Sequence, residues 1–196
     1  MNDYIKKVEE SVKISAFKIG KLEPGPLAEL RRMKNNLGSP LFWRLASIFP
    51  ETIGSNKHDE WVVIIRILAI LTEKGDPKAR GKLHNPNRPL GQVLCDAGNP
   101  GNTWPENRTL KPIPKFSEHR FMQLLSSRGK QRAVLVERAA RILARTMASG
   151  SGLDVTHLAW AILNPENGEI LAREYYKRLD QAERAHLEID KGDIND

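Results

Sequence analysis

The histidine, cysteine and carboxylate residues are spaced in ways that offer no ready catalytic or metal site. None of the five histidines has a second histidine four residues away, the spacing that lets two imidazoles share a metal on one helix face. Asp154 and His157 come closest to a site, but Asp154 precedes an apolar segment and is expected to be a helix N-cap. His58, Asp59 and Glu60 are consecutive, and consecutive helix positions point in different directions.

The motifs of nucleotide-dependent and nucleophilic enzymes are also missing from the sequence. It contains no Walker phosphate loop, no dinucleotide glycine fingerprint and no G-x-S-x-G elbow. Cys95, the single cysteine, follows Leu94 in a short apolar segment and is expected to be packed there. One cysteine permits no internal disulfide, which fits the reducing cytoplasm. We therefore expect a cytoplasmic protein that is not an enzyme and needs no metal or other cofactor.

Basic residues are the remaining group that could carry a function. The chain has 31 Lys and Arg against 24 Asp and Glu, a net charge of +7, and the charge is uneven. Residues 74–88 carry net +4 and residues 118–145 net +5, whereas residues 180–196 carry net −4. Arg138, Arg141 and Arg145 fall on one side of a predicted helix. This distribution is compatible with a nucleic-acid partner without proving one.

The elements that must position these cations are predicted to be helices. Apolar residues recur at helical spacing in nine segments: near 5–19, and over 27–36, 41–49, 58–74, 90–97, 118–127, 131–148, 155–163 and from 164 onward. Gly25–Pro26, Ser39–Pro40, Ser117 and Asp154 are the expected start signals. The longest apolar run, residues 61–71, contains Arg66 and is too short for a membrane span of about 20 residues.

These segments predict an all-α fold. We expect a compact helical bundle at residues 1–179, made of two packed lobes at 1–97 and 116–179. A long irregular loop at about 98–115, tethered by Trp104, separates the lobes, and an acidic tail occupies residues 180–196. Arg66 interrupts the most apolar helix, so it either meets a carboxylate inside the protein or emerges at a working surface.

Six blocks of sequence resemble one known family in order and spacing. They are LAELRR at 27–32, SPLFWRL at 39–45, LGQVL at 90–94, SEHRFMQLL at 117–125, VERAARIL at 136–143 and LDVTHL at 153–158. Together they are similar to the small subunit of the type I-E CRISPR Cascade complex, the CasB family, from about residue 20 to residue 179. The stretch 98–115 is longer than the usual connection in that family, and the acidic tail does not align.

The resemblance implies a non-catalytic subunit present as two copies in the complex. Its expected partners are the backbone, large and RNA-processing subunits, the CRISPR RNA, and the target DNA including the displaced strand. Base pairing then reads the sequence, while protein charge stabilises the opened strands of the R-loop. No membrane partner is expected.

The resemblance also suggests which cations face nucleic acid. Arg32, Lys57 and Arg120 match basic positions of the family, and a basic loop of the family corresponds to residues near 78–82. Arg128, Lys130 and Arg138 fall in matched basic regions with looser registration. The candidate nucleic-acid-binding residues are Arg31, Arg32, Lys57, Arg66, Lys78, Arg80, Lys82, Arg120, Arg128, Lys130 and Arg138.

Two other functions stay open at this point. A stand-alone regulator could use the turn near Gly129 as part of a helix-turn-helix. Its recognition helix would then begin with the apolar residues Ala133, Val134, Leu135 and Val136, where base-reading side chains belong. A structural adaptor could instead use its basic faces to contact acidic proteins without touching nucleic acid.

Overall fold

The computed structural model is built from helices, which confirms the predicted all-α class. It describes residues 2–34, 38–53, 57–98, 104–105, 111–164, 166 and 168–192. Within these ranges the helices are α1 Asn2–Gly20, α2 Pro24–Arg31, α3 Pro40–Ala46, α4 His58–Leu71, α5 Leu90–Asp96, α6 Glu118–Ser126, α7 Gly129–Thr146, α8 Val155–Leu163 and α9 Gly168–Gly192. The described residues form no strand, only an isolated bridge between His84 and Leu153.

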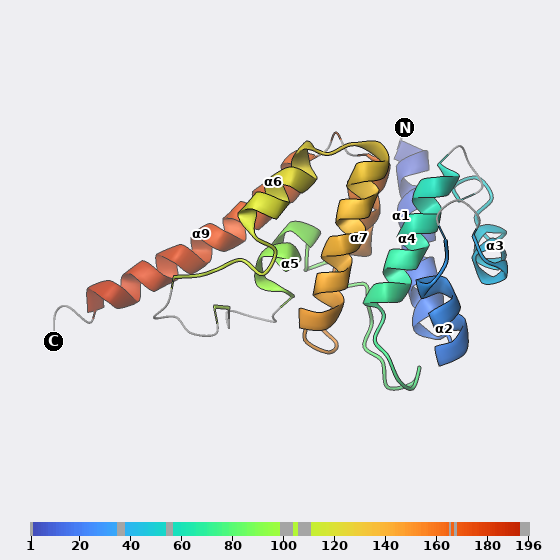
Figure 1. Ribbon diagram of the computed structural model, residues 1–196, viewed down its shortest axis with the longest axis horizontal. Helices are drawn as coiled ribbons and strands as arrows, with labels where there is room; N and C mark the ends of the chain where they lie inside the picture. The colour runs from blue at the N-terminus through green and yellow to red at the C-terminus, as the bar shows by residue number, and fades with distance from the viewer. Residues whose placement is uncertain are drawn as a thin grey trace.

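Helix α4 lies at the centre of the molecule. It packs against α1, α2, α7 and α8, and Figure 1 shows α7 beside it and α1 behind it. Ten of its fourteen residues are buried, because it is apolar nearly all round. The helix ends at Leu71, earlier than the predicted residue 74, because Thr72 adopts an extended backbone.

Side-chain caps fix two helix starts where the sequence predicted them. Ser39 accepts a hydrogen bond from the Phe42 amide at 3.2 Å, and Asp154 accepts one from the Thr156 amide at 2.9 Å. Ser117 occupies the predicted N-cap position of α6 without a side-chain cap bond.

Other predicted helix boundaries were also wrong. Helix α3 ends at Ala46 and not at residue 49, and α7 runs from Gly129 to Thr146 and not over 131–148. Helix α2 begins at Pro24, so Gly25 lies inside it, and it ends at Arg31. The predicted end of this helix, at residues 35–36, lies outside the described residues. Helix α9 begins at Gly168, later than the predicted start at residues 164–165.

Helices α5 and α9 pack closely in the second half of the chain. A Cβ on Gly91 of α5 would lie 2.3 Å from the Leu171 carbonyl of α9, so only glycine permits this approach. Tyr175 stacks on Phe121 of α6 with ring centroids 3.9 Å apart, and its hydroxyl donates to the Phe116 carbonyl at 2.7 Å. Cys95 is buried here as predicted, and its burial raises the pKa of the thiol to about 12.

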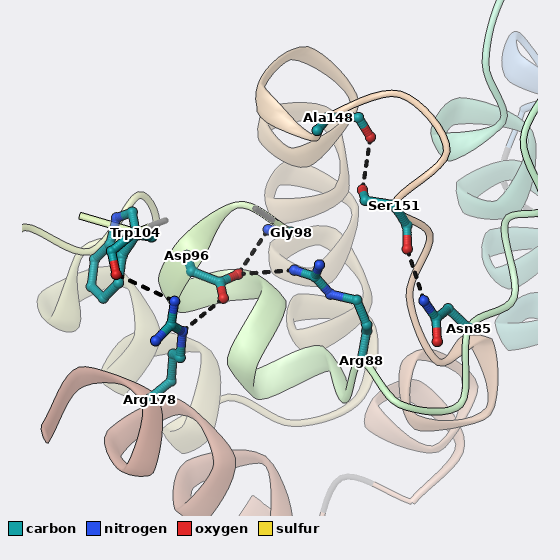
Figure 2. A network of polar contacts seen from close by, with 8 residues as sticks. All are labelled: Asn85, Arg88, Asp96, Gly98, Trp104, Ala148, Ser151 and Arg178. Atoms are coloured by element: carbon teal, nitrogen blue, oxygen red, sulfur yellow. Dashed lines mark hydrogen bonds and ion pairs between the residues drawn. The ribbon is translucent and has the colours of Figure 1, made fainter. Parts of the chain in front are cut away.

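A buried carboxylate, Asp96 at the end of α5, connects α9 to the segment before α5. It accepts hydrogen bonds from Arg178 of α9 at 2.9 Å, from Arg88 at 3.4 Å and from the Gly98 amide at 2.9 Å, as Figure 2 shows. Arg178 also lies over the Trp104 ring, 5.4 Å from its centroid. Trp104 is 4% exposed, which confirms that it tethers the predicted 98–115 loop. Residues 99–103 and 106–110 of that loop lie outside the described residues.

The proposed domain boundaries stay a prediction. Buried side chains from α1 to α9 belong to one hydrophobic cluster, which runs from Val8 to Ala182. Helix α9 continues without a break past residue 180 as far as Gly192, so the first part of the acidic tail is helical. None of the described helices is long and apolar enough to cross a membrane.

Candidate nucleic-acid interface

The position of Arg66 decides between the two possibilities that the sequence left open. Its guanidinium is buried between α4 and α7, where Nε donates to the Glu137 carboxylate at 3.1 Å. Its Nη1 donates to the Met33 carbonyl at 2.8 Å. Arg66 therefore meets a carboxylate inside the protein and ties α2, α4 and α7 together, so we leave it out of the interface.

Three further candidate cations bind carbonyl groups at helix ends. Arg31 donates to two carbonyls at the end of α4, at 2.8 and 2.6 Å. Arg80 donates to two carbonyls at the end of α1, at 3.1 and 2.6 Å. Lys57 donates to the last carbonyl of α8 at 2.6 Å. Cations stabilise helix C-termini because they satisfy free carbonyls and oppose the helix dipole. The structural contacts of these three side chains leave them less able to bind a ligand.

The other candidates are exposed but do not form one group. Arg128 pairs with Glu166 at 3.0 Å, and Arg32 donates to the Ala28 carbonyl of its own helix at 3.2 Å. Figure 1 places α2 and α6 on opposite sides of the α4–α7 pair. Arg32 directly follows α2, and Arg120 lies in α6. The two arginines therefore do not line a common groove.

The basic loop is fixed against the rest of the protein. Glu73 accepts hydrogen bonds from the Gly81 amide at 2.9 Å and from the Ser149 hydroxyl and Gly150 amide, both at 2.7 Å. The Leu153 amide donates to the Leu83 carbonyl at 2.8 Å. These bonds hold the loop on the α7–α8 connection and leave Lys78 and Lys82 exposed.

The Glu73 contacts predict an acid-sensitive attachment. The hydrogen bond from Gly81, together with those from Ser149 and Gly150, lowers the pKa of the Glu73 carboxyl despite partial burial. Its contribution to stability is therefore present above the ordinary pKa and is lost as the pH falls through the lower, folded-state value. Glu73→Gln should lower the free energy of unfolding by about 1 kcal/mol at neutral pH and by much less near pH 3.

Urea unfolding at both pH values measures this effect. Exposed Glu188→Gln on α9 is the matched control and should change stability little at either pH. If Glu73→Gln lowered the free energy of unfolding equally at both pH values, the negative charge of Glu73 would not contribute to stability.

Four cations lie on one exposed side of α7, with the apolar Val134 between the first two. Lys130, Arg138, Arg141 and Arg145 are all exposed, and on a helix with 3.6 residues per turn they fall within about 80° of arc. We call this set the α7 basic stripe. Two carboxylates border the stripe: Glu137 pairs with Arg141 at 2.7 Å and is shared with Arg66, and Asp59 lies 3.9 Å from the Lys130 ammonium. The stripe is about 22 Å long at about 1.5 Å per residue.

A cavity of about 550 Å³ adjoins the C-terminal half of the stripe. Arg31, Lys74, Arg141 and Arg145 contribute to its walls, together with Glu73 and Ser149. The Glu73 carboxylate is already engaged by two amides and a hydroxyl. We call this cavity the basic groove. The stripe and the basic groove together bring six cations to one region of the surface: Arg31, Lys74, Lys130, Arg138, Arg141 and Arg145.

The structure adds three residues to the predicted set. Lys74, Arg141 and Arg145 were not among the predicted candidates, although the three- and seven-residue spacings from Arg138 could have identified the two arginines. The described residues contain no group of three or more His, Cys, Asp or Glu that could hold a metal ion.

The sequence matches one known protein family. Residues 26–181 match the model of the CRISPR-associated protein Cse2 family, well over half of the chain. The chain belongs to the Cse2 family. It is thus a small subunit of a type I-E Cascade complex, a structural component that associates with the other subunits. No curated protein and no solved structure matched the chain.

The Cse2 match begins inside α2 and ends in α9. Helix α1, Asn2–Gly20, lies outside the matched residues although it packs against α4 and α8. The α7 basic stripe lies wholly inside the match. The predicted resemblance to the Cascade small subunit is therefore confirmed over residues 26–181.

Proposed function

We propose that this Cse2 subunit binds the sugar-phosphate backbone of nucleic acid along the α7 basic stripe and the basic groove. The observation that carries the proposal is a set of four exposed cations on one side of α7, bordered by two carboxylates, Glu137 and Asp59. Phosphates of one B-form strand are about 3.4 Å apart along the axis, so the stripe can follow about six of them. Contacts to phosphates position a strand and do not read its sequence.

Within Cascade this binding would stabilise the R-loop that the CRISPR RNA forms with target DNA. Opening a duplex against a guide RNA is nearly balanced in free energy, so a few backbone contacts can shift it. The stripe would hold the displaced strand or the adjoining duplex. Lys78, Lys82, Arg32 and Arg120 would add weaker contacts from separate surfaces, with a second copy of the subunit extending the path. The subunit contributes charge and shape in this scheme, and no chemistry.

The helix-turn-helix alternative fits the structure less well. The recognition helix would be α7, yet Arg132, Ala133, Leu135 and Val136 near its start are at most 8% exposed. A recognition helix presents its N-terminal side chains to base edges in the major groove. Helix α7 presents its basic stripe instead, which suits backbone contact.

Salt dependence tests the proposed backbone binding. For four phosphate contacts on a single strand, the logarithm of affinity should fall with the logarithm of salt concentration with a slope of about −3. Fluorescence anisotropy with labelled oligothymidylate, from about 50 to about 200 mM salt, measures the slope. Two duplexes of unrelated sequence should bind equally well. A flat salt response, or a strong preference for one duplex, would contradict backbone binding.

A further inference from the structure

A second pocket lies on the side of α7 that faces away from the basic stripe. It has a volume of about 500 Å³ and is formed by α1, α8 and the start of α9. Arg132 of α7 lines it, and Arg141 of the stripe is nine residues further on, half a turn around the helix. Most of the wall is apolar, and its main contributors are Tyr4, Ile5, Trp160, Leu163, Ile170 and Leu171.

The cation Arg132 gives this apolar pocket its chemical character. Its side chain is 1% exposed, and it donates from Nε to the Ala161 carbonyl at 2.7 Å and from Nη1 to the Leu124 carbonyl at 2.8 Å. The third nitrogen, Nη2, is buried and has no hydrogen-bond partner among the described residues, none of which forms an ion pair with Arg132. Burial lowers the pKa of Arg132, the Arg128 charge adds to this effect, and the Glu166 carboxylate opposes it.

A buried guanidinium with an unpaired N–H group and no direct ion pair favours the arrival of an anion. Leaving a buried donor unpaired costs free energy, and a carboxylate that approaches it recovers hydrogen bonding and charge neutralisation together. The second cation of the pocket, Lys57, already contacts the Leu163 carbonyl and adds positive potential. The pocket is therefore suited to one negative group.

The rest of the surface argues for a peptide and against a nucleic-acid strand. Tyr4 and Ile170 line the pocket and are each 42% exposed, which is typical of a protein contact surface. Glu9 also lines the pocket, and its carboxylate would repel a polyanion. Tyr4, Ile5 and Glu9 belong to α1, outside residues 26–181 that match the family.

We propose that this pocket docks an aliphatic segment of another Cascade subunit that carries one carboxylate, and that the carboxylate pairs with Arg132. The apolar side chains of the segment cover Tyr4 and Ile170. This docking is separate from nucleic-acid binding, because it uses the opposite side of α7. It would orient the subunit so that the basic stripe is left open.

A change of charge at the pocket rim tests the docking. Ile170→Asp places a like charge beside the incoming carboxylate, so affinity for the rest of the complex, purified without this subunit, should fall about tenfold. Ile170→Lys should bind at least as well as the wild type. Ile113→Asp, at a site 76% exposed and outside the pocket, is the control and should leave the affinity unchanged. Equal effects of Asp and Lys at 170, or no effect of either, would overturn the proposal.

Crosslinking identifies the occupant. A photoreactive phenylalanine derivative at residue 170 of the assembled complex should capture one segment of another subunit that contains Asp or Glu among aliphatic residues. The same group at residue 113 should not capture that segment. Capture of nucleic acid, of a second copy of this chain, or of nothing beyond the residue 113 control would overturn the proposal. None of these outcomes depends on whether the stripe binds nucleic acid.

Discussion

Replacing Asp96 by asparagine should lower the free energy of unfolding by about 3 to 5 kcal/mol. Asp96 is fully buried and receives hydrogen bonds from two arginines, Arg88 and Arg178, which are 7% and 6% exposed (Figure 2). A neutral amide would leave both buried guanidinium groups without the carboxylate that balances them. The loss of one partner from a buried ion pair costs more than the pair contributes.

Urea unfolding of the full chain measures this loss. Asp180→Asn, on the exposed side of α9, is the matched control and should change stability by less than about 0.5 kcal/mol. Because Asp96 links α9 to the segment before α5, the variant should also expose Trp104, and its fluorescence should shift. If Asp96→Asn were as stable as the control variant, the Asp96 network would contribute nothing to folding.

Removing three cations of the α7 basic stripe should have the largest effect on nucleic-acid binding. The triple variant combines Lys130→Ala, Arg138→Ala and Arg145→Ala and loses three phosphate contacts. On a single strand, each contact contributes about 0.7 to the slope of log affinity against log salt concentration. The magnitude of this slope should therefore fall by about 2, and the affinity at about 0.1 M salt should fall about a hundredfold. Anisotropy with oligothymidylate measures both quantities.

The control for the stripe variant removes the same charge elsewhere. This control is a second triple variant that replaces exposed cations of α1 and α9 by alanine: Lys18, Lys177 and Arg184. If net charge alone attracted nucleic acid, both triple variants would lose the same affinity. The proposed interface requires a small loss for the control and a large one for the stripe variant.

The helices could be predicted from the sequence because their signals are local. Apolar spacing within a segment and caps such as Ser39 and Asp154 act within a few residues. The boundaries that were missed depend on other parts of the chain. Helix α4 ends at Leu71, for example, where Arg31 of α2 binds its final carbonyls.

The role of each cation could not be predicted in the same way. Arg66 meets Glu137, 71 residues later, and Lys57 meets the Leu163 carbonyl, 106 residues later. No periodicity within a segment encodes such contacts, so buried, capping and exposed cations look alike in the sequence. Part of the stripe could be predicted from the sequence, because Arg138, Arg141 and Arg145 lie on one helix and their spacing alone places them on the same face.

Target-DNA binding by the assembled complex tests most directly whether the α7 basic stripe acts in Cascade. Complexes would be prepared with the wild-type subunit, the stripe variant or the control variant, and checked for equal subunit content. R-loop formation on a matching duplex would then be measured by the reactivity of displaced-strand thymines to permanganate. We expect the stripe variant to assemble normally but to open the target far less than the control variant does. Equal opening by the two would contradict a role for the stripe in holding DNA.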